Sequence, residues 1–266
     1  MSGAIALAPT PKTETFPHDE PNEGEENDPL IVEDVAEDSQ YAVLDSDNIR
    51  PEDRMGDNFA QIAAYAFLLG TWLIVFVSNP VKLGWFFWHP ILQSLSICLL
   101  AYGIVTLQPT SQPRTKAAGL ARHQYAILWG SFPALLLGTL AIWWNKTLHG
   151  SRHATTWHGI LGYISVFWVV VVQVFIGIGS VWFDGRLFGG NPKAKLVWKY
   201  HRLSGYLLFP LLLLTVFLGG LWSHFSTGNT VLAVRIVLFG VAPLVLLVAV
   251  YVRVRYVVKM IQNLRY

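Results

Sequence analysis

The sequence predicts an all-α membrane protein with six transmembrane helices. Hydrophobic residues make up 53% of the 266 residues and charged residues only 14%, well below the quarter that is usual in soluble domains. Six apolar runs, each long enough to cross about 30 Å of hydrocarbon, follow one another after residue 58. Of the 17 acidic residues, 16 lie in residues 1–58, so the apolar part of the chain contains a single acid, Asp184.

Residues 1–58 have a different chemistry from the rest of the chain. They contain 16 acids, only three bases and few aromatic residues. Too little apolar surface is present to offset the entropy of ordering such a segment. We therefore expect a disordered acidic tail over 1–58, a transmembrane domain over 59–256 and a short basic C-terminus over 257–266.

The six spans are predicted from uninterrupted apolar sequence. In the first, Phe59–Asn79, Gln61 is the only strongly polar residue before the end. The glycines and prolines within the spans fit this assignment, because membrane helices tolerate both better than soluble helices do. The other five spans are expected near residues 86–107, 123–144, 157–183, 203–223 and 231–252.

The distribution of basic residues predicts the orientation. With six spans, both termini lie on one face, and twelve bases flank the spans on that face against four on the other. The excess of Lys and Arg marks the cytoplasmic face, so both termini are expected in the cytosol. The sequence does not indicate which membrane holds the protein, and nothing in it suggests a nucleic-acid partner.

Four histidines stand near the beginnings of spans two to five: His89, His123, His158 and His201. Spans two and four both start at the non-cytosolic face, so His89 and His158 should lie at one depth. Spans three and five both start at the cytosolic face, which places His123 and His201 together. Two imidazoles at equal depth can bind one haem iron from opposite sides. We therefore predict a central four-helix bundle that holds two b-type haems as its cofactors.

A shared motif supports this interpretation for two of the histidines. Gly162 and Gly205 each lie four residues after a histidine, on the same helix face, where the missing side chain would let a flat porphyrin approach the backbone. A lone histidine at a helix start is more often an interfacial polar residue than a ligand. His153 is the alternative to His158, although the bundle geometry favours His158.

The motifs around these histidines resemble the cytochrome b561 family of six-helix, two-haem transmembrane electron carriers. The resemblance covers roughly residues 59–256. It rests on Trp88-His89-Pro90, Arg122-His123-Gln124, Trp157-His158-Gly159 and Lys199-Tyr200-His201-Arg202.

The resemblance implies an oxidoreductase that passes electrons from a cytosolic donor, commonly ascorbate, to a non-cytosolic acceptor such as monodehydroascorbate or a ferric chelate. A homodimer is a further expectation, because family members often form dimers. A cluster of bases beside the cytosolic histidines could attract an anionic donor, and two loop histidines could face the acceptor. The donor-site candidates are Lys116, Arg122, Lys199 and Arg202, and the acceptor-site candidates are His149 and His153.

A haem-free transporter or scaffold with interfacial histidines is the alternative from a different class. Acids or paired charges inside the membrane would favour a transporter. Asp184 lies at the end of a span, which argues against coupling to protons or cations.

Overall fold

The computed structural model of the protein describes residues 51–107, 113–181 and 197–263. Every regular element within these ranges is a helix, and no strand occurs there. The predicted fold class is confirmed, because six helical stretches among the described residues are long and apolar enough to cross a membrane. They run over Asn58–Val77, Pro80–Val105, Ala118–Leu148, Trp157–Ile178, Tyr200–Trp222 and Leu232–Val252. Residues 1–50, which make up most of the acidic tail, lie outside the described ranges.

Several spans are made of more than one helical segment. Besides α-helices, the described residues form a 3₁₀ turn, η2, and three π-helical turns, η3, η4 and η7. In chain order the elements are α2 (Pro51–Val77), α3 (Pro80–Leu83), η2 (Gly84–Phe87), α4 (Trp88–Val105), α5 (Pro113–Gln124), η3 (Tyr125–Ser131), α6 (Phe132–Leu148), α7 (Trp157–Trp168), η4 (Val169–Val174), α8 (Phe175–Val181), α9 (Trp198–Trp222), α10 (His224–Asn229), α11 (Leu232–Arg235), η7 (Ile236–Val241) and α12 (Ala242–Asn263).

Two helix starts differ from the sequence-based expectation. Helix α2 begins at Pro51, before the predicted start of span one at Phe59. His123 does not open its helix, because α5 already begins at Pro113 and continues through η3 into α6. Polar and basic residues can continue a helix beyond the hydrocarbon, where apolar patterning no longer marks its start. The predicted equal depth of His123 and His201 does not depend on this boundary.

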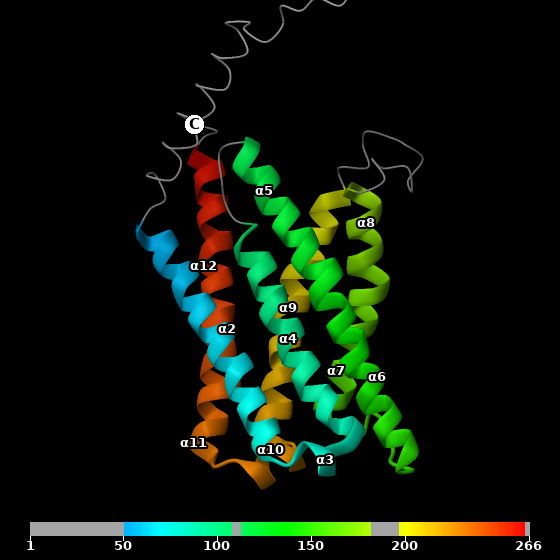
Figure 1. Ribbon diagram of the computed structural model, residues 1–266. Coiled ribbons are helices and arrows are strands. Elements are labelled where there is room, and N and C mark those ends of the chain that lie inside the picture. The colour runs from blue at the N-terminus through cyan, green and yellow to red at the C-terminus, as the bar shows by residue number, and fades with distance from the viewer. Residues whose placement is uncertain (1–50, 108–112, 182–196, 264–266) are drawn as a thin grey trace, which may run out of the picture. The chain divides into compact units, whose positions relative to one another are not determined.

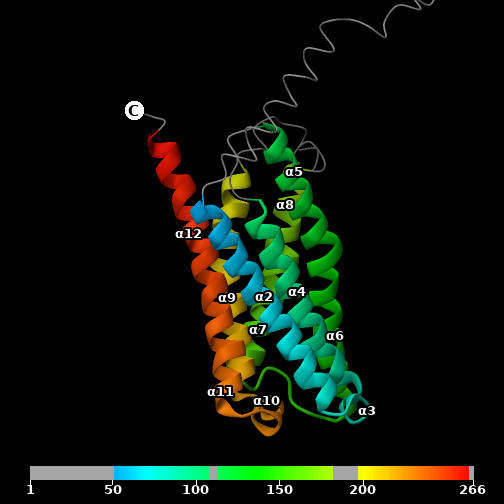
Figure 2. The ribbon, with the colours of Figure 1, turned by 60° about the vertical axis from the view of Figure 1, so that its left-hand side comes forward.

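The first and last spans lie together at one side of the helical bundle. Figures 1 and 2 show α2 beside α12, with α4 and α9 next to them, while α6, α7 and α8 lie on the far side. Helix α4 packs against α6, and α7 packs against α9. Spans two to five therefore form two antiparallel helix pairs, and spans one and six cover one side of them.

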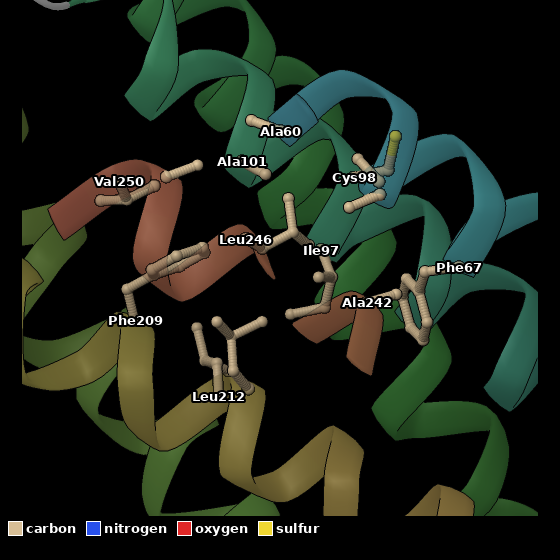
Figure 3. Packing of buried hydrophobic residues seen from close by; sticks show 14 of the residues in the cluster. Ala60, Phe67, Ile97, Cys98, Ala101, Phe209, Leu212, Ala242, Leu246 and Val250 are labelled. Atoms are coloured by element: carbon tan, nitrogen blue, oxygen red, sulfur yellow. The ribbon is translucent and has the colours of Figure 1, made fainter. Parts of the chain in front are cut away.

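A cluster of buried hydrophobic side chains lies between α2, α4, α9 and α12, as Figure 3 shows. Leu246 of α12 is fully buried at its centre. Small residues such as Ala60, Ala101 and Ala242 lie in the same cluster and allow the helices to approach closely. In lipid, such close packing replaces water exclusion as the force that holds helices together. Span four is different, because only 6% of its apolar 18-residue stretch is buried, against 44% of the corresponding stretch in span two.

Polar side chains also join the paired helices within the membrane. The Nε2 group of Gln93 in α4 donates to the carbonyl of Leu135 (3.1 Å) and to Oγ1 of Thr139 (2.9 Å), both in α6. The indole of Trp168 in α7 donates to Oγ of Ser204 in α9 at 2.7 Å. These bonds satisfy polar groups that have no water partner in the hydrocarbon and fix each helix pair in one register.

Candidate functional site

The structure brings His89 of α4 and His158 of α7 together. Their ring centroids are 6.0 Å apart, and the ring planes form an angle of 76°. His158 is the second residue of α7, and Thr156 caps that helix by accepting a hydrogen bond from the backbone N–H of Gly159 at 3.1 Å. The cap determines where α7 begins and so places His158 in its first turn.

The second pair, His123 of α5 and His201 of α9, has almost the same geometry. The ring centroids are 6.3 Å apart, and the planes form an angle of 86°. Each predicted pair is therefore formed by helices that lie far apart in the sequence. Each of spans two to five contributes one histidine. The two pairs therefore lie among the four helices that the sequence predicts for the central bundle.

The spacing within each pair fits a metal ion bound between the two rings. A bond from a metal ion to an imidazole nitrogen is about 2 Å long, so two nitrogens on opposite sides lie about 4 Å apart and the ring centroids about 6 Å apart. The observed separations of 6.0 Å and 6.3 Å match this value. Direct packing of the rings at such angles is also seen in ordinary aromatic pairs. The hydrogen bonds of the rings show whether the imidazoles are also oriented as metal ligands.

Three of the four rings bind a backbone carbonyl through Nδ1. The distances are 3.1 Å from His89 to Gly138, 2.8 Å from His158 to Thr215 and 3.1 Å from His123 to Gly103. A carbonyl oxygen only accepts, so each Nδ1 carries the proton and each Nε2 keeps a free lone pair. Histidines that bind metals use this arrangement, because the Nδ1–H bond fixes both the tautomer and the ring orientation. The residues present therefore fit a haem iron.

His201 is held in a different way. Its Nδ1 is buried and has no hydrogen-bond partner among the described residues. The ring instead lies against Gly177 of α8, where an added Cβ would be 3.0 Å from Cε1 of the imidazole. The backbone carbonyl of His201 accepts a long hydrogen bond, 3.4 Å, from Nε2 of Gln173. The orientation of this ring thus depends on packing rather than on a bond to Nδ1.

Glycines of the partner helices make room for the rings. At Gly219 of α9, an added Cβ would be only 2.6 Å from Cε1 and Nδ1 of His158. Gly219 and Gly177 thus play the same part for the two histidines of the α7–α9 pair. Neither glycine was predicted as a site residue from the sequence, because each lies more than 20 residues from the histidine it faces. At Gly162 and Gly205, the two glycines predicted from the sequence, a Cβ would make only ordinary contacts of 3.7 Å and 3.5 Å.

The two helix pairs share one register. Gly103, whose carbonyl accepts the hydrogen bond of His123, lies 14 residues after His89 in α4. Gly138, whose carbonyl accepts the hydrogen bond of His89, lies 15 residues after His123 in the span that packs against α4. The π-helical turn η3 lies between His123 and Gly138 and accommodates the additional residue. At about 1.5 Å per residue, 14 residues separate the two histidine layers by about 21 Å along the helix.

The other helix pair repeats this pattern. Thr215 lies 14 residues after His201 in α9 and holds His158. Gln173 lies 15 residues after His158 and one turn before Gly177, which contacts His201. The π-helical turn η4 covers part of this longer stretch. Both pairs therefore combine a regular α-helix with a helix that contains a π turn.

Comparison with known proteins identifies the family. The family model for eukaryotic cytochrome b561 matches residues 88–227, about half of the chain, and this range includes all four paired histidines. The chain belongs to the cytochrome b561 family. This family binds haem, which agrees with the fit of the histidine pairs to iron.

Two relatives carry the name transmembrane reductase CYB561D2, one from Bos taurus and one from Homo sapiens. Each is 30% identical to this cytochrome b561 family member over 146 residues, which are 54% of this chain and 64% of the relative. The alignment thus spans somewhat less than two thirds of the relatives' length. No solved structure matches the chain.

The acceptor-site candidates lie at the end of the bundle where the short helices α3 and α10 are found. A cavity of about 480 Å³ opens there, and His149 is one of its lining residues. His153 lies outside the His89–His158 pair, with its ring stacked on Trp143 and its Nδ1 3.2 Å from the hydroxyl of Tyr163. The ring of Phe86 lies 6.2 Å from that of His89. The cavity is lined by Lys82, Leu83, Gly84, Trp85, Phe86, Asn145, His149 and Ser151.

The donor-site candidates lie at the opposite end of the bundle. The exposed guanidinium group of Arg122 donates a long hydrogen bond, 3.4 Å, to the carbonyl of Thr106 at the end of α4. Arg202 is also exposed and directly follows His201. The side chains of Lys116 and Lys199 lie outside the described residues. The guanidinium groups of Arg122 and Arg202 are thus two exposed basic groups on residues adjacent in sequence to His123 and His201.

Proposed function

We propose that this family member carries electrons across a membrane through two haem b groups. His89 and His158 would bind one iron, and His123 and His201 would bind the other. The observation that carries the proposal is the repeated geometry: two pairs of rings at 6.0 Å and 6.3 Å, with three Nδ1 atoms bonded to carbonyls. The name of the relatives, transmembrane reductase, supports the same role.

The haems would supply reversible one-electron chemistry, and the chain would supply their positions. A bare charge crosses hydrocarbon only at high cost. Two redox centres about 21 Å apart along the helices divide most of the roughly 30 Å of hydrocarbon into shorter steps. In spans two, three and five, the spacing between the histidine and the backbone carbonyl that binds a ring of the other pair sets this separation.

We assign the His123–His201 pair to the cytosolic face. Twelve bases flank the spans on the face that also holds both termini, against four on the other face, and this excess supports a cytosolic location. Arg122 and Arg202, together with Lys116 and Lys199, would attract an anionic donor such as ascorbate. The acidic residues 1–58 would then form a cytosolic tail, and 257–266 a short basic cytosolic C-terminus.

The acceptor would bind near the His89–His158 pair. The cavity at this end is lined by Lys82 and His149, whose donors suit an anion such as monodehydroascorbate or a ferric chelate. Phe86 belongs both to the wall of the cavity and to the surroundings of His89, since its ring lies 6.2 Å from the imidazole. An acceptor in the cavity would therefore be close to the non-cytosolic haem. In the homodimer expected from the family resemblance, each chain would contain one such cavity.

Electron transfer across sealed vesicles tests the proposal. The purified protein should show a reduced b-type spectrum with two haems per chain. After reconstitution, ascorbate on the cytosolic side should reduce external ferricyanide or a ferric chelate, while vesicles without protein should not. A protein that folds and contains no haem would overturn the proposal and favour the transporter or scaffold alternative.

A further inference from the structure

An apolar groove of about 310 Å³ lies between α2 and α4, at the opposite end of the bundle from the acceptor-site cavity. Small buried side chains line it, among them those of Ala64 in α2 and of Cys98 and Ala101 in α4. The exposed rings of Tyr65 and Tyr102 also line it, one from each helix. Because both helices cross the membrane, the groove opens to lipid rather than to water.

The groove covers the depth of one membrane leaflet. Along α4 its lining runs from Leu95 to Thr106, which caps the end of that helix. Along α2 it runs from Leu68 back to Gln61, near the start of span one. The eleven residues from Leu95 to Thr106 correspond to about 16 Å, close to half of the roughly 30 Å of hydrocarbon. The groove therefore begins near the membrane surface and ends near the middle of the bilayer, as an acyl chain does.

The width of the groove suits a single hydrocarbon chain. Over a length of about 16 Å, a volume of about 310 Å³ gives a mean cross-section of about 20 Å², which is about 4–5 Å across. Non-bonded carbon atoms approach one another to about 4 Å, so one chain fills this width. A helix with its side chains is about 10–12 Å wide, so a helix of a second protein does not fit.

The lining changes from apolar to polar toward the membrane surface. Leu68 and Leu95 lie at the deep end, whereas Gln61 and Thr106 lie at the shallow end. Arg122 of α5 adds a positive charge there, because its guanidinium group donates to the backbone carbonyl of Thr106. An amphiphile with an apolar chain and an anionic head would match this order.

The guanidinium group of Arg122 can bind a further anion. Its bond to the Thr106 carbonyl is long, 3.4 Å, and the side chain is exposed, so its other N–H donors are accessible. Helix α5 approaches this carbonyl closely, since a Cβ at Gly119 would be only 3.1 Å from it. The close approach places the charge of Arg122 at the shallow end of the groove.

We propose that this groove binds one acyl chain of an anionic phospholipid whose phosphate lies against Arg122. A guanidinium group binds phosphate oxygens through two parallel N–H bonds. Basic pockets between transmembrane helices at the cytosolic face bind anionic lipid head groups, and Arg122 lies at the face assigned above to the cytosol. The lipid does not depend on haem for its binding, so this site goes beyond the electron-transfer role.

The bound lipid would join three helices at one end of the bundle. Its chain would contact α2 and α4, and its phosphate would bind α5. The same end of α4 contains Gly103, whose carbonyl accepts the hydrogen bond of His123. Arg122 is also a donor-site candidate, so the lipid phosphate and an anionic electron donor would compete for it.

Native mass spectrometry of the purified full-length protein tests the proposal without any electron-transfer reaction. The protein in neutral detergent is titrated with phosphatidylglycerol, which is anionic, or with phosphatidylcholine, which carries no net charge. We expect one tightly bound phosphatidylglycerol per chain, with an affinity about fivefold above that of phosphatidylcholine. Arg122→Gln should abolish this preference and leave phosphatidylcholine binding unchanged. Arg202→Gln is the matched control, because it removes the same charge from α9, which does not line the groove.

A second pair of variants tests the apolar part of the groove. Ala64→Leu would extend a side chain into the space for the acyl chain, so the affinity for both lipids should fall by about tenfold or more. Ala66→Leu is the matched control, because it adds the same side chain at an exposed position of α2 outside the groove.

Photolabelling of the wild type locates the chain without any substitution. A phosphatidylglycerol with a diazirine group midway along one acyl chain should label α4 between Leu95 and Thr106 and α2 between Gln61 and Leu68. Equal affinity for the two lipids, or labelling spread over all six spans, would overturn the proposal. A second copy of the chain as the occupant would also overturn it. That outcome would appear as a dimer that Ala64→Leu converts to a monomer, with no lipid label on α2 or α4.

Discussion

The two histidine pairs are alike in spacing but not in the way their rings are held. At the His89–His158 pair, both Nδ1 atoms donate to backbone carbonyls. At the His123–His201 pair, only His123 does so, and Nδ1 of His201 is buried without a partner among the described residues. The first pair is thus fixed by two directional bonds, and the second by one bond and one packing contact. We infer that the same kind of substitution should weaken haem binding to a different extent at the two sites.

Loss of a histidine should give the largest effect. We expect His158→Ala and His201→Ala each to lose one haem per chain, because an iron with one remaining axial nitrogen is held weakly. Haem content from the reduced pyridine spectrum, relative to protein, measures the result. Retention of both haems in His158→Ala would reject that ligand and turn attention to His153.

Added methyl groups at the two ring-facing glycines should separate the sites. A Cβ at Gly219 would be 2.6 Å from two atoms of His158 and would push the ring away from Thr215, whereas a Cβ at Gly177 would be 3.0 Å from the His201 ring. Overpacking costs about 1–3 kcal/mol, so Gly219→Ala should weaken haem retention by about 5- to 150-fold. Gly177→Ala should have the smaller effect. The reverse order, seen in haem release to apomyoglobin, would contradict the comparison.

Gly162→Ala and Gly205→Ala should act on haem binding and leave the helices intact. A Cβ at either position would make only ordinary contacts with other side chains, so a loss of fold is not expected. If a porphyrin lies against these glycines, haem content falls while the helical circular dichroism and the monodisperse elution persist. Unchanged haem content would show that the His-x3-Gly motif has no role in the site.

Shortening the π-helical turns should produce the smallest change. Deletion of one residue from η3 would reduce the stretch from His123 to Gly138 to the 14 residues found between His89 and Gly103. Both histidine–carbonyl bonds should then form on a regular α-helix, and both haems should remain. Deletion of one residue within α4 is the matched control, because it would rotate His89 and Gly103 relative to each other and should abolish one site.

Much of the fold could be predicted from the sequence. The apolar runs locate all six spans, because length and apolar composition determine whether a helix can cross the hydrocarbon. The pairing of the histidines follows from topology, because alternate spans begin at the same face. Helix starts such as Pro51 were less predictable, since helices continue past the apolar sequence.

The details of the site were less accessible. Gly138, Gly219 and Thr215 contact histidines in other helices, and their part depends on the register between helices, which no local pattern records. The stacking of His153 on Trp143 likewise joins a loop to a helix end. A signal was present in the sequence: a glycine or a threonine lies 14 or 15 residues after the histidine in spans two, three and five. It becomes visible only when two antiparallel helices are compared.

The use of main-chain oxygens as partners has a consequence for how this protein can evolve. Amino-acid replacements alter side chains and leave carbonyl groups in place, so no point mutation can delete the partners of His89, His123 or His158. The position of the proton on each of these rings therefore depends on the helix backbone and not on the side chain of the residue that provides the carbonyl. Selection acting on it should leave little trace in the identity of the residues that provide it, and variation at Thr215 would be uninformative about its importance.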